Sequence, residues 1–122
     1  FQSAKVIVDA PNHAIANALP KSWSHTEEWY SWDKSPRASG FNVVAMLDEQ
    51  SYTPEQNVMG KKRDLRMGDH PIVWSSCIKR GRAVYSALGH TAEAFEQTEH
   101  KQLLENAIGW SMGLTGDEGG CE

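Results

Sequence analysis

The stretches IVWSSCI at residues 72–78 and RAVYSAL at residues 82–88 decide much of the fold. These two apolar runs are joined by Lys-Arg-Gly at 79–81. Two apolar runs with a short joint that contains glycine are typical of a β-hairpin. The sequence therefore predicts two antiparallel strands here, and it places Cys77 within the first strand as a small buried apolar side chain.

Two further strands are expected before this hairpin. Residues 5–9 form a short β-branched apolar run, which predicts a buried strand with Asp9 at its carboxyl end. Residues 41–47 predict a second apolar strand that ends in Asp48 and a glutamate. Residues 14–19 between them predict a short helical turn, because a proline follows directly and stops it.

One long helix is expected after the hairpin. Residues 98–112 carry apolar side chains at three- and four-residue spacing, and Thr98 is suited to cap the start of this helix. Gly113 is a natural stop, and residues 92–95 predict a brief helical turn before the helix.

Three segments show no lasting hydrophobic period. Residues 21–40 are expected to form an ordered loop, and residues 50–70 an exposed, basic excursion rather than a phosphate site. Residues 114–122 are glycine-rich and acidic, so we expect a flexible tail after a single domain at 1–113.

Composition narrows the class of protein. The chain has 122 residues, of which 39% are hydrophobic and 23% charged, and this excludes collagen-like, coiled-coil and fully disordered chains. A net charge of -4 argues against a general nucleic-acid binder. No apolar run is long enough for a membrane span, and no signal segment opens the chain. We expect a soluble protein that binds neither nucleic acid nor membrane and is cytoplasmic or exported after processing.

The two cysteines and the first residue add two expectations. Cys77 and Cys121 are too few for a disulfide framework or for a complete thiolate metal site. The chain starts at Phe1 rather than Met, which suggests a processed product or an excised piece.

Tryptophan is unusually frequent. The chain contains five, and three of them fall within residues 23–32. Each indole buries a large area, so packing in the core is one interpretation. A face on which sugar rings stack is the other, and residues 23–32 are the best placed for it.

Several segments, taken in their order and spacing, resemble the trehalose-utilisation (ThuA-like) family. They are VIVD at 6–9 with His13 downstream, LP at 19–20 before Trp23, TEEWY at 26–30, VVAMLD at 43–48, MGDHPIVW at 67–74, Gly81 followed by RAVYSALGHT at 82–91, and LL at 103–104 through IGW at 108–110.

The resemblance implies a fold. It covers the C-terminal part of that family's domain, which resembles class I glutamine amidotransferases and has a flavodoxin-like parallel sheet. The expected fold is therefore α/β, a partial flavodoxin-like sheet with a β-hairpin and a C-terminal helix. The preceding part of the domain is absent from this chain, so we expect either a homo-oligomer or a partner that supplies the missing N-terminal half.

The resemblance also implies three catalytic candidates, which are His13, Glu28 and His90. Ligands of open α/β sheets bind beyond the carboxyl ends of strands, and Asp9, Asp48 and His90 fall at such ends. We therefore expect the catalytic candidates His13, Glu28 and His90 to converge in space. Imidazole and carboxylate groups gathered there could act as general acid and base on a sugar. The same three side chains could instead hold a divalent metal as cofactor.

Ligand-binding candidates are Tyr30, Trp29, Trp32 and Asp9. Each candidate also has a structural interpretation: His90 as a turn cap, Glu28 as a brace for its loop, and Tyr30 as a packed ring. His25, His70 and His100 have no persuasive partner in the sequence and are expected at the surface.

The expected function is in carbohydrate metabolism. The resemblance implies action on a disaccharide or sugar derivative, by acid/base or metal-assisted chemistry, and favours a hydrolase-like bacterial enzyme. Two alternatives stay open: a non-catalytic carbohydrate-binding module that uses residues 23–32, and a subunit that is active only beside the missing N-terminal half.

Overall fold

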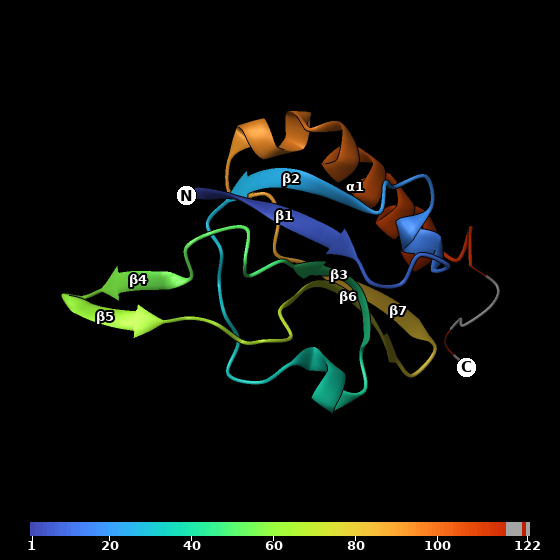
Figure 1. Cartoon of the computed structure of the whole chain (residues 1–122). Helices are drawn as coiled ribbons and strands as arrows, with labels where there is room; N and C mark the ends of the chain where they lie inside the picture. Colours follow the sequence, from blue (N-terminus) through green and yellow to red (C-terminus); the bar gives the residue numbers. More distant parts are fainter. Residues whose placement is uncertain (117–120, 122) are drawn as a thin grey trace.

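The computed structural model describes residues 1–116 and residue 121. The described chain forms strands, short 3-10 turns (η) and one α-helix (Figure 1). In order, these are β1 (Gln2–Val8), η1 (Ala14–Ala16), β2 (Ser22–Glu27), η2 (Pro36–Ser39), β3 (Asn42–Leu47), β4 (Glu55–Val58), β5 (Lys61–Asp64), β6 (Pro71–Ile78), β7 (Gly81–Ser86), η3 (Ala92–Glu96) and α1 (Thr98–Ser111).

Five of the strands form one curled sheet in the order β2-β1-β3-β6-β7, a half-barrel against which α1 packs (Figure 1). Each neighbouring pair in this sheet is antiparallel. The expected α/β class, the hairpin and the C-terminal helix are confirmed, and the expected flavodoxin-like parallel sheet is wrong for the described strands. Parallel neighbours need long crossover connections, usually helical, whereas β6 and β7 are joined by two residues.

Strand direction decides which side chains share an edge of the sheet. β1 and β6 run one way, and β2, β3 and β7 run the other. The carboxyl end of β1, with Asp9, therefore lies at the edge opposite to the ends of β3 and β7. The expectation that Asp9, Asp48 and His90 share one edge is wrong, because it assumed parallel strands.

Strand β2 lies in the segment that was expected to be a loop. Its inward-facing residues Trp23, His25 and Glu27 are buried, and they alternate with exposed Ser24 and Thr26. Two of these three buried side chains are polar. The sequence of β2 therefore lacks the alternation of apolar and polar residues by which a half-buried strand is recognised. The pairing of β2 with β1 places Trp23 opposite Val6, within the core.

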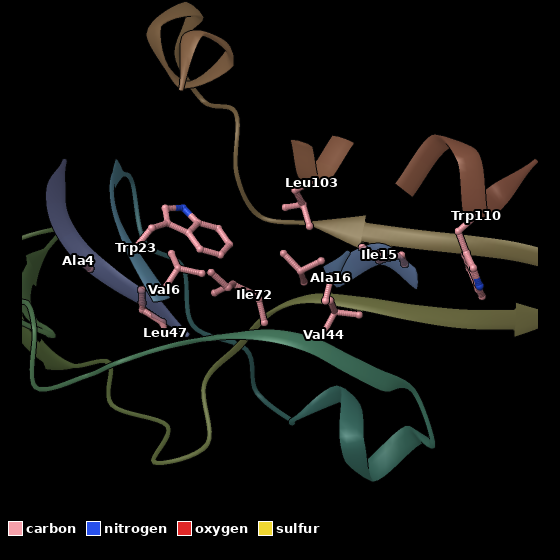
Figure 2. Close-up of a cluster of buried hydrophobic side chains, with 12 residues drawn as sticks. Ala4, Val6, Ile15, Ala16, Trp23, Val44, Leu47, Ile72, Leu103 and Trp110 are labelled. Carbon is pink, nitrogen blue, oxygen red and sulfur yellow. The ribbon is translucent and has the colours of Figure 1, made fainter. Parts of the chain in front are cut away.

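The core lies between the curled sheet and α1 (Figure 2). Leu103 and Trp110 point from α1 toward the sheet, and Ile15 of η1 closes one end. Ile108 and Met112, on the outward side, are 60% and 67% exposed. The helix begins at Thr98 as expected, but Gln97 takes the N-cap position and makes no side-chain cap, which corrects the capping role given to Thr98.

The end of the chain returns to the hairpin. Cys77 is exposed at the end of β6 and forms a disulfide with Cys121, so it is not the buried apolar side chain that the sequence predicted. Arg82, directly opposite Cys77, donates hydrogen bonds to the carbonyls of Trp110, Thr115 and Gly116 at 2.9, 2.9 and 3.2 Å. Residues 117–120 and 122 of the expected flexible tail lie outside the described residues.

Strands β4 and β5 form a separate hairpin that projects from the sheet (Figure 1). This segment is exposed, as expected of residues 50–70, but it is paired rather than irregular. Its two-residue turn places Met59 and Gly60 at φ 51° and 76°. Met59 is 97% exposed, so nothing in the described fold compensates its left-handed conformation. Among the described residues, no helix has the length and apolar character needed to cross a membrane.

Replacing Met59 by asparagine is expected to stabilise this hairpin by about 0.5–1 kcal/mol, because Asn-Gly is the preferred dipeptide for turns with two positive φ angles. Slower amide hydrogen exchange in β4 and β5 would confirm the effect. Met59→Val is the opposing control and should speed the exchange, since β-branched residues tolerate positive φ poorly. Equal exchange in both variants would contradict the prediction.

Candidate functional site

The Glu28 carboxylate and the His90 imidazole lie in contact where β2 and β7 end. His90 Nδ1 lies 3.0 Å from Glu28 Oε2, and the two side chains are 46% and 43% exposed. β2 and β7 are the outer strands of the sheet, but its curl brings their carboxyl ends together. The expectation that Glu28 and His90 lie at one place is confirmed.

Glu27 holds this pair in place from below the surface. It is 1% exposed, and its carboxylate accepts backbone N–H groups from Gly89 at 2.8 Å, His90 at 3.2 Å and Glu28 at 3.3 Å. Burial raises the pKa of Glu27, but the hydrogen bonds from Gly89, His25, Glu28 and His90 outweigh it and leave the pKa below its ordinary value. Glu27 is therefore a buried carboxylate whose hydrogen bonds hold the backbones of Glu28 and His90 at the end of β2.

Glycine is required at residue 89 for this approach. Gly89 has φ +111°, and a Cβ there would lie 2.8 Å from the Phe95 ring. The N–H groups of Gly89 and His90 can therefore point at Glu27 only because this position lacks a side chain.

A pocket of about 530 Å³ opens beside Glu28, which lines it, whereas His90 is not among its lining residues. Glu28, Trp29 and Tyr30 line one side of it. The rest of the lining comes from the N-terminus, the end of β2, Ser31, the segment before β4, strand β4 and the residue after β5. These residues are Phe1, Gln2, Glu27, Ser31, Tyr52, Pro54, Gln56, Asn57, Val58 and Leu65. The pocket thus has aromatic rings, amides and the two carboxylates of Glu27 and Glu28, a mixture of apolar and polar groups that small-molecule sites use.

The aromatic side chains at this pocket are held in place. Trp29 donates its indole N–H to the Gln2 carbonyl at 2.9 Å. The Glu28 carboxylate accepts a hydrogen bond from the Tyr30 hydroxyl, which raises the pKa of Tyr30. Phe1 packs edge-on against His90, with the ring centres 4.9 Å apart.

Behind the pocket, His70 supports Tyr30. It is fully buried and donates from Nε2 to the Tyr30 carbonyl at 2.8 Å, while its Nδ1 lies 3.4 Å from the Tyr52 hydroxyl. Burial, followed by the charge of Glu49, raises the pKa of Tyr52 to about 12, so this hydroxyl stays protonated at neutral pH.

His25 and His100 are also buried, so the surface positions expected for His25, His70 and His100 are wrong. His25 Nε2 lies 3.2 Å from Glu27, and His100 donates from Nδ1 to the Ala94 carbonyl at 2.8 Å. Burial lowers the pKa of His100. Most of the partners of these three imidazoles are contributed by other elements, and a sequence pattern does not show such contacts.

His13 is not part of this site. It follows β1, at the opposite edge of the sheet, and caps η1 by accepting the Ile15 N–H at Nδ1 (3.1 Å). Its Nε2 lies 3.2 Å from Ser75 Oγ. Burial and the nearby Arg82 lower its pKa. The predicted convergence of His13 with Glu28 and His90 is therefore wrong.

Two ligand-binding candidates also lie elsewhere. Asp9 pairs with Arg37 at 2.8 Å, and Arg37 in turn pairs with Asp69 at 2.9 Å. Trp32 donates to the Pro71 carbonyl at 2.7 Å and packs edge-on against Trp74. Of the predicted binding residues, Trp29 and Tyr30 line the pocket, and Asp9 and Trp32 do not.

The alternative of a metal held by His13, Glu28 and His90 together does not fit the fold, because His13 lies at the opposite edge of the sheet. Within residues 1–116 and 121, no group of three or more His, Cys, Asp or Glu side chains is arranged to hold a metal ion.

Comparison with known proteins agrees with the fold. Residues 1–111 match a family described as trehalose utilisation, ThuA. A crystal structure of a ThuA-like protein from Bacteroides uniformis ATCC 8492 superposes with a TM-score of 0.72 and 35% sequence identity. The match covers 90% of this chain and 43% of that one, so the chain spans less than half the length of this relative. A search of curated proteins found no match. Because the family match extends over residues 1–111, the chain belongs to the trehalose-utilisation (ThuA) family.

Proposed function

We propose that the pocket beside Glu28 and His90 binds a sugar and that this pair performs acid/base chemistry on it. The observation that carries the proposal is the 3.0 Å contact between the His90 imidazole and Glu28, because Glu28 lines a pocket of about 530 Å³ together with aromatic side chains. Membership of the trehalose-utilisation family supports a disaccharide or sugar derivative as the ligand.

The roles of the two side chains follow from their contact. Glu28 faces Nδ1 of His90, so the imidazole keeps its proton on that nitrogen and leaves Nε2 free to accept one. His90 Nε2 takes the proton of a sugar hydroxyl as general base, and the Glu28 carboxylate stabilises the imidazolium that results. The oxygen that has lost its proton forms a bond to the carbon of the scissile C–O bond as that bond breaks, and the proton passes from Nε2 to the departing oxygen.

The remaining residues bind and position the ligand. The rings of Trp29 and Phe1 offer apolar faces to the C–H surface of a sugar, and Tyr30 orients Glu28 through its hydroxyl. Glu27 stays below the surface and keeps the Glu28 and His90 backbones together.

Replacing Glu28 by glutamine, or His90 by glutamine, is expected to lower turnover of a disaccharide or sugar derivative about 10²–10⁴-fold, the usual contribution of general acid/base catalysis. Sugar affinity, measured from tryptophan fluorescence, should change only a few-fold. Glu96→Gln is the matched control, because Glu96 forms an exposed ion pair with Lys101, away from the pocket. Unchanged turnover in the Glu28 and His90 variants would contradict the catalytic proposal.

A role in binding alone is the second candidate. Its support is narrower than the sequence suggested, because Trp23 is buried in the core and Trp32 packs on Trp74, which leaves Trp29 as the one tryptophan of residues 23–32 that lines the pocket. Loss of sugar binding in Trp29→Ala, with no turnover of any sugar by the wild-type chain, would favour this candidate.

A third proposal is that the site acts together with a further part of a longer protein. The length of the Bacteroides uniformis relative, of which this chain matches 43%, supports it. Turnover by a longer form of the protein, with none by this chain, would favour this third proposal over the first.

A further inference from the structure

We infer that the ligand of this pocket carries a negative charge, a carboxylate or a phosphate, and that Arg63 and Lys61 of the projecting hairpin recognise it. This inference rests on the proposed sugar site and adds the class of sugar: an acidic or phosphorylated one. It comes from the strand register of the hairpin, from the ion pairs on one of its faces, and from the hairpin residues that line the pocket.

The register places both cations on the same face of the hairpin as two residues that line the pocket, although neither cation is itself among the lining residues. Arg63 is directly opposite Gln56, and Lys61 is directly opposite Val58. Residues directly opposite one another in an antiparallel pair project from the same face. Gln56 and Val58 line the pocket, and so does Leu65, which continues the alternation of Lys61 and Arg63 along the strand.

On the other face of the hairpin, the charged side chains form ion pairs with one another. Lys62 pairs with Glu55 at 2.7 Å, and Arg66 pairs with Asp64 at 3.1 Å and with Glu55 at 3.5 Å. Both acidic side chains of residues 55–66 are thus taken by cations other than Arg63 and Lys61.

Arg63 and Lys61 form no ion pair within the part of the chain that the structure describes. They provide a charge that an anionic ligand can neutralise, and arginine can bind a carboxylate or phosphate through two parallel hydrogen bonds.

The positions of the charges also orient the ligand. Glu28, Gln56 and Val58 all line the pocket, and Arg63 and Lys61 lie on the hairpin that contributes Gln56 and Val58. A carboxylate or phosphate is repelled by Glu28 and attracted by Arg63 and Lys61, so it lies against the hairpin. The uncharged ring hydroxyls then face Glu28 and His90, as the proposed chemistry requires.

Three small probes test the inference: methyl glucoside, which is neutral, methyl glucuronide, which carries a carboxylate, and glucose 6-phosphate. We expect the wild-type chain to bind at least one anionic probe about tenfold more tightly than methyl glucoside, with the difference shrinking as salt is added, because exposed charges are screened. The anionic probe that binds more tightly identifies which of the two groups the hairpin prefers.

The double variant Arg63→Gln with Lys61→Gln should bind the anionic probes no more tightly than methyl glucoside, with the affinity for methyl glucoside unchanged. Lys62→Gln with Arg66→Gln removes the same charge from the opposite face, and its preference for anionic probes should stay within about threefold of wild type, since electrostatic steering by the net charge is weak in salt. Circular dichroism checks that both variants are folded.

Two results would overturn the inference. If methyl glucoside binds as tightly as the anionic probes, the sugar site stands and its preference for anions does not. If the two double variants lose the preference equally, it comes from net charge rather than from the pocket face of the hairpin. Failure of all three probes to bind the wild-type chain would overturn the proposed sugar site as well.

Discussion

Replacing Glu27 by alanine is expected to lower the free energy of unfolding by about 3–5 kcal/mol, because it leaves buried backbone donors without an acceptor. The N–H groups of Gly89, His90 and Glu28 all point at this carboxylate, which is 1% exposed. The variant also removes the partner of His25. Urea unfolding followed by circular dichroism measures the loss.

The neighbouring residue supplies the control. Glu28→Ala removes a carboxylate that is 43% exposed and pairs with an exposed imidazole, so its cost should stay below about 1 kcal/mol. Similar losses in the two variants would show that the buried network does not brace the site.

The contribution of Glu27 to the free energy of unfolding should also appear in the wild-type chain when the pH is lowered. The pKa of Glu27 in the folded chain lies below its ordinary value of 4.5, so its stabilisation is present above pH 4.5 and is lost as the pH falls through the folded-state pKa. Glu27→Gln does not titrate, and its stability should fall less steeply below pH 4.5 than that of the wild type. Parallel acid profiles for the two proteins would contradict the role of this carboxylate.

Replacing Trp110 by alanine is expected to cost about 3–5 kcal/mol, the range for removing a large aromatic side chain from a core. Trp110 is 1% exposed and closes the core at the end of α1. Its ring packs on His13 with centres 5.3 Å apart and lies under the Arg82 guanidinium at 5.0 Å. The change therefore removes contacts to the sheet, to η1 and to the returning chain end together.

Ile108→Ala tests whether this loss comes from burial rather than from helix propensity. Ile108 lies on the same helix but is 60% exposed, so its removal should cost less than about 1 kcal/mol. Comparable denaturation midpoints for the two variants would mean that α1 does not pack through Trp110.

Local patterns were enough to predict several elements. The hairpin of β6 and β7, the helix α1, and the strands β1 and β3 lie within a few residues of the predicted positions. In each case the apolar residues follow the period of the element, and glycine or proline marks most of the ends. Strand β2 was missed because His25 and Glu27 face inward, which reverses the usual pattern.

The candidate site was predicted in part for a similar reason. The family resemblance selected Glu28, His90 and Tyr30, which lie together, and also His13, which does not. The tryptophan cluster added Trp29, which lines the pocket. The parallel sheet implied by the resemblance would have placed all strand ends on one edge. Glu27 was overlooked as the buried brace, although its position two residues after His25 and four after Trp23 already puts it on the inner face of a strand.

By itself, the sequence determined the α/β class, the hairpin at 72–88 and the terminal helix, and it indicated Glu28 and His90 as site candidates. Only the tertiary structure decided that the sheet is antiparallel and curled, that three histidines are buried and that Cys77 is bonded to Cys121. It also decided that the separate hairpin of β4 and β5 contributes to the pocket. Hydrophobic period records which face of a segment is buried, but not which segment covers it or in which direction that segment runs. Contacts between distant segments depend on strand order and direction, and these are set by the packing of the whole chain.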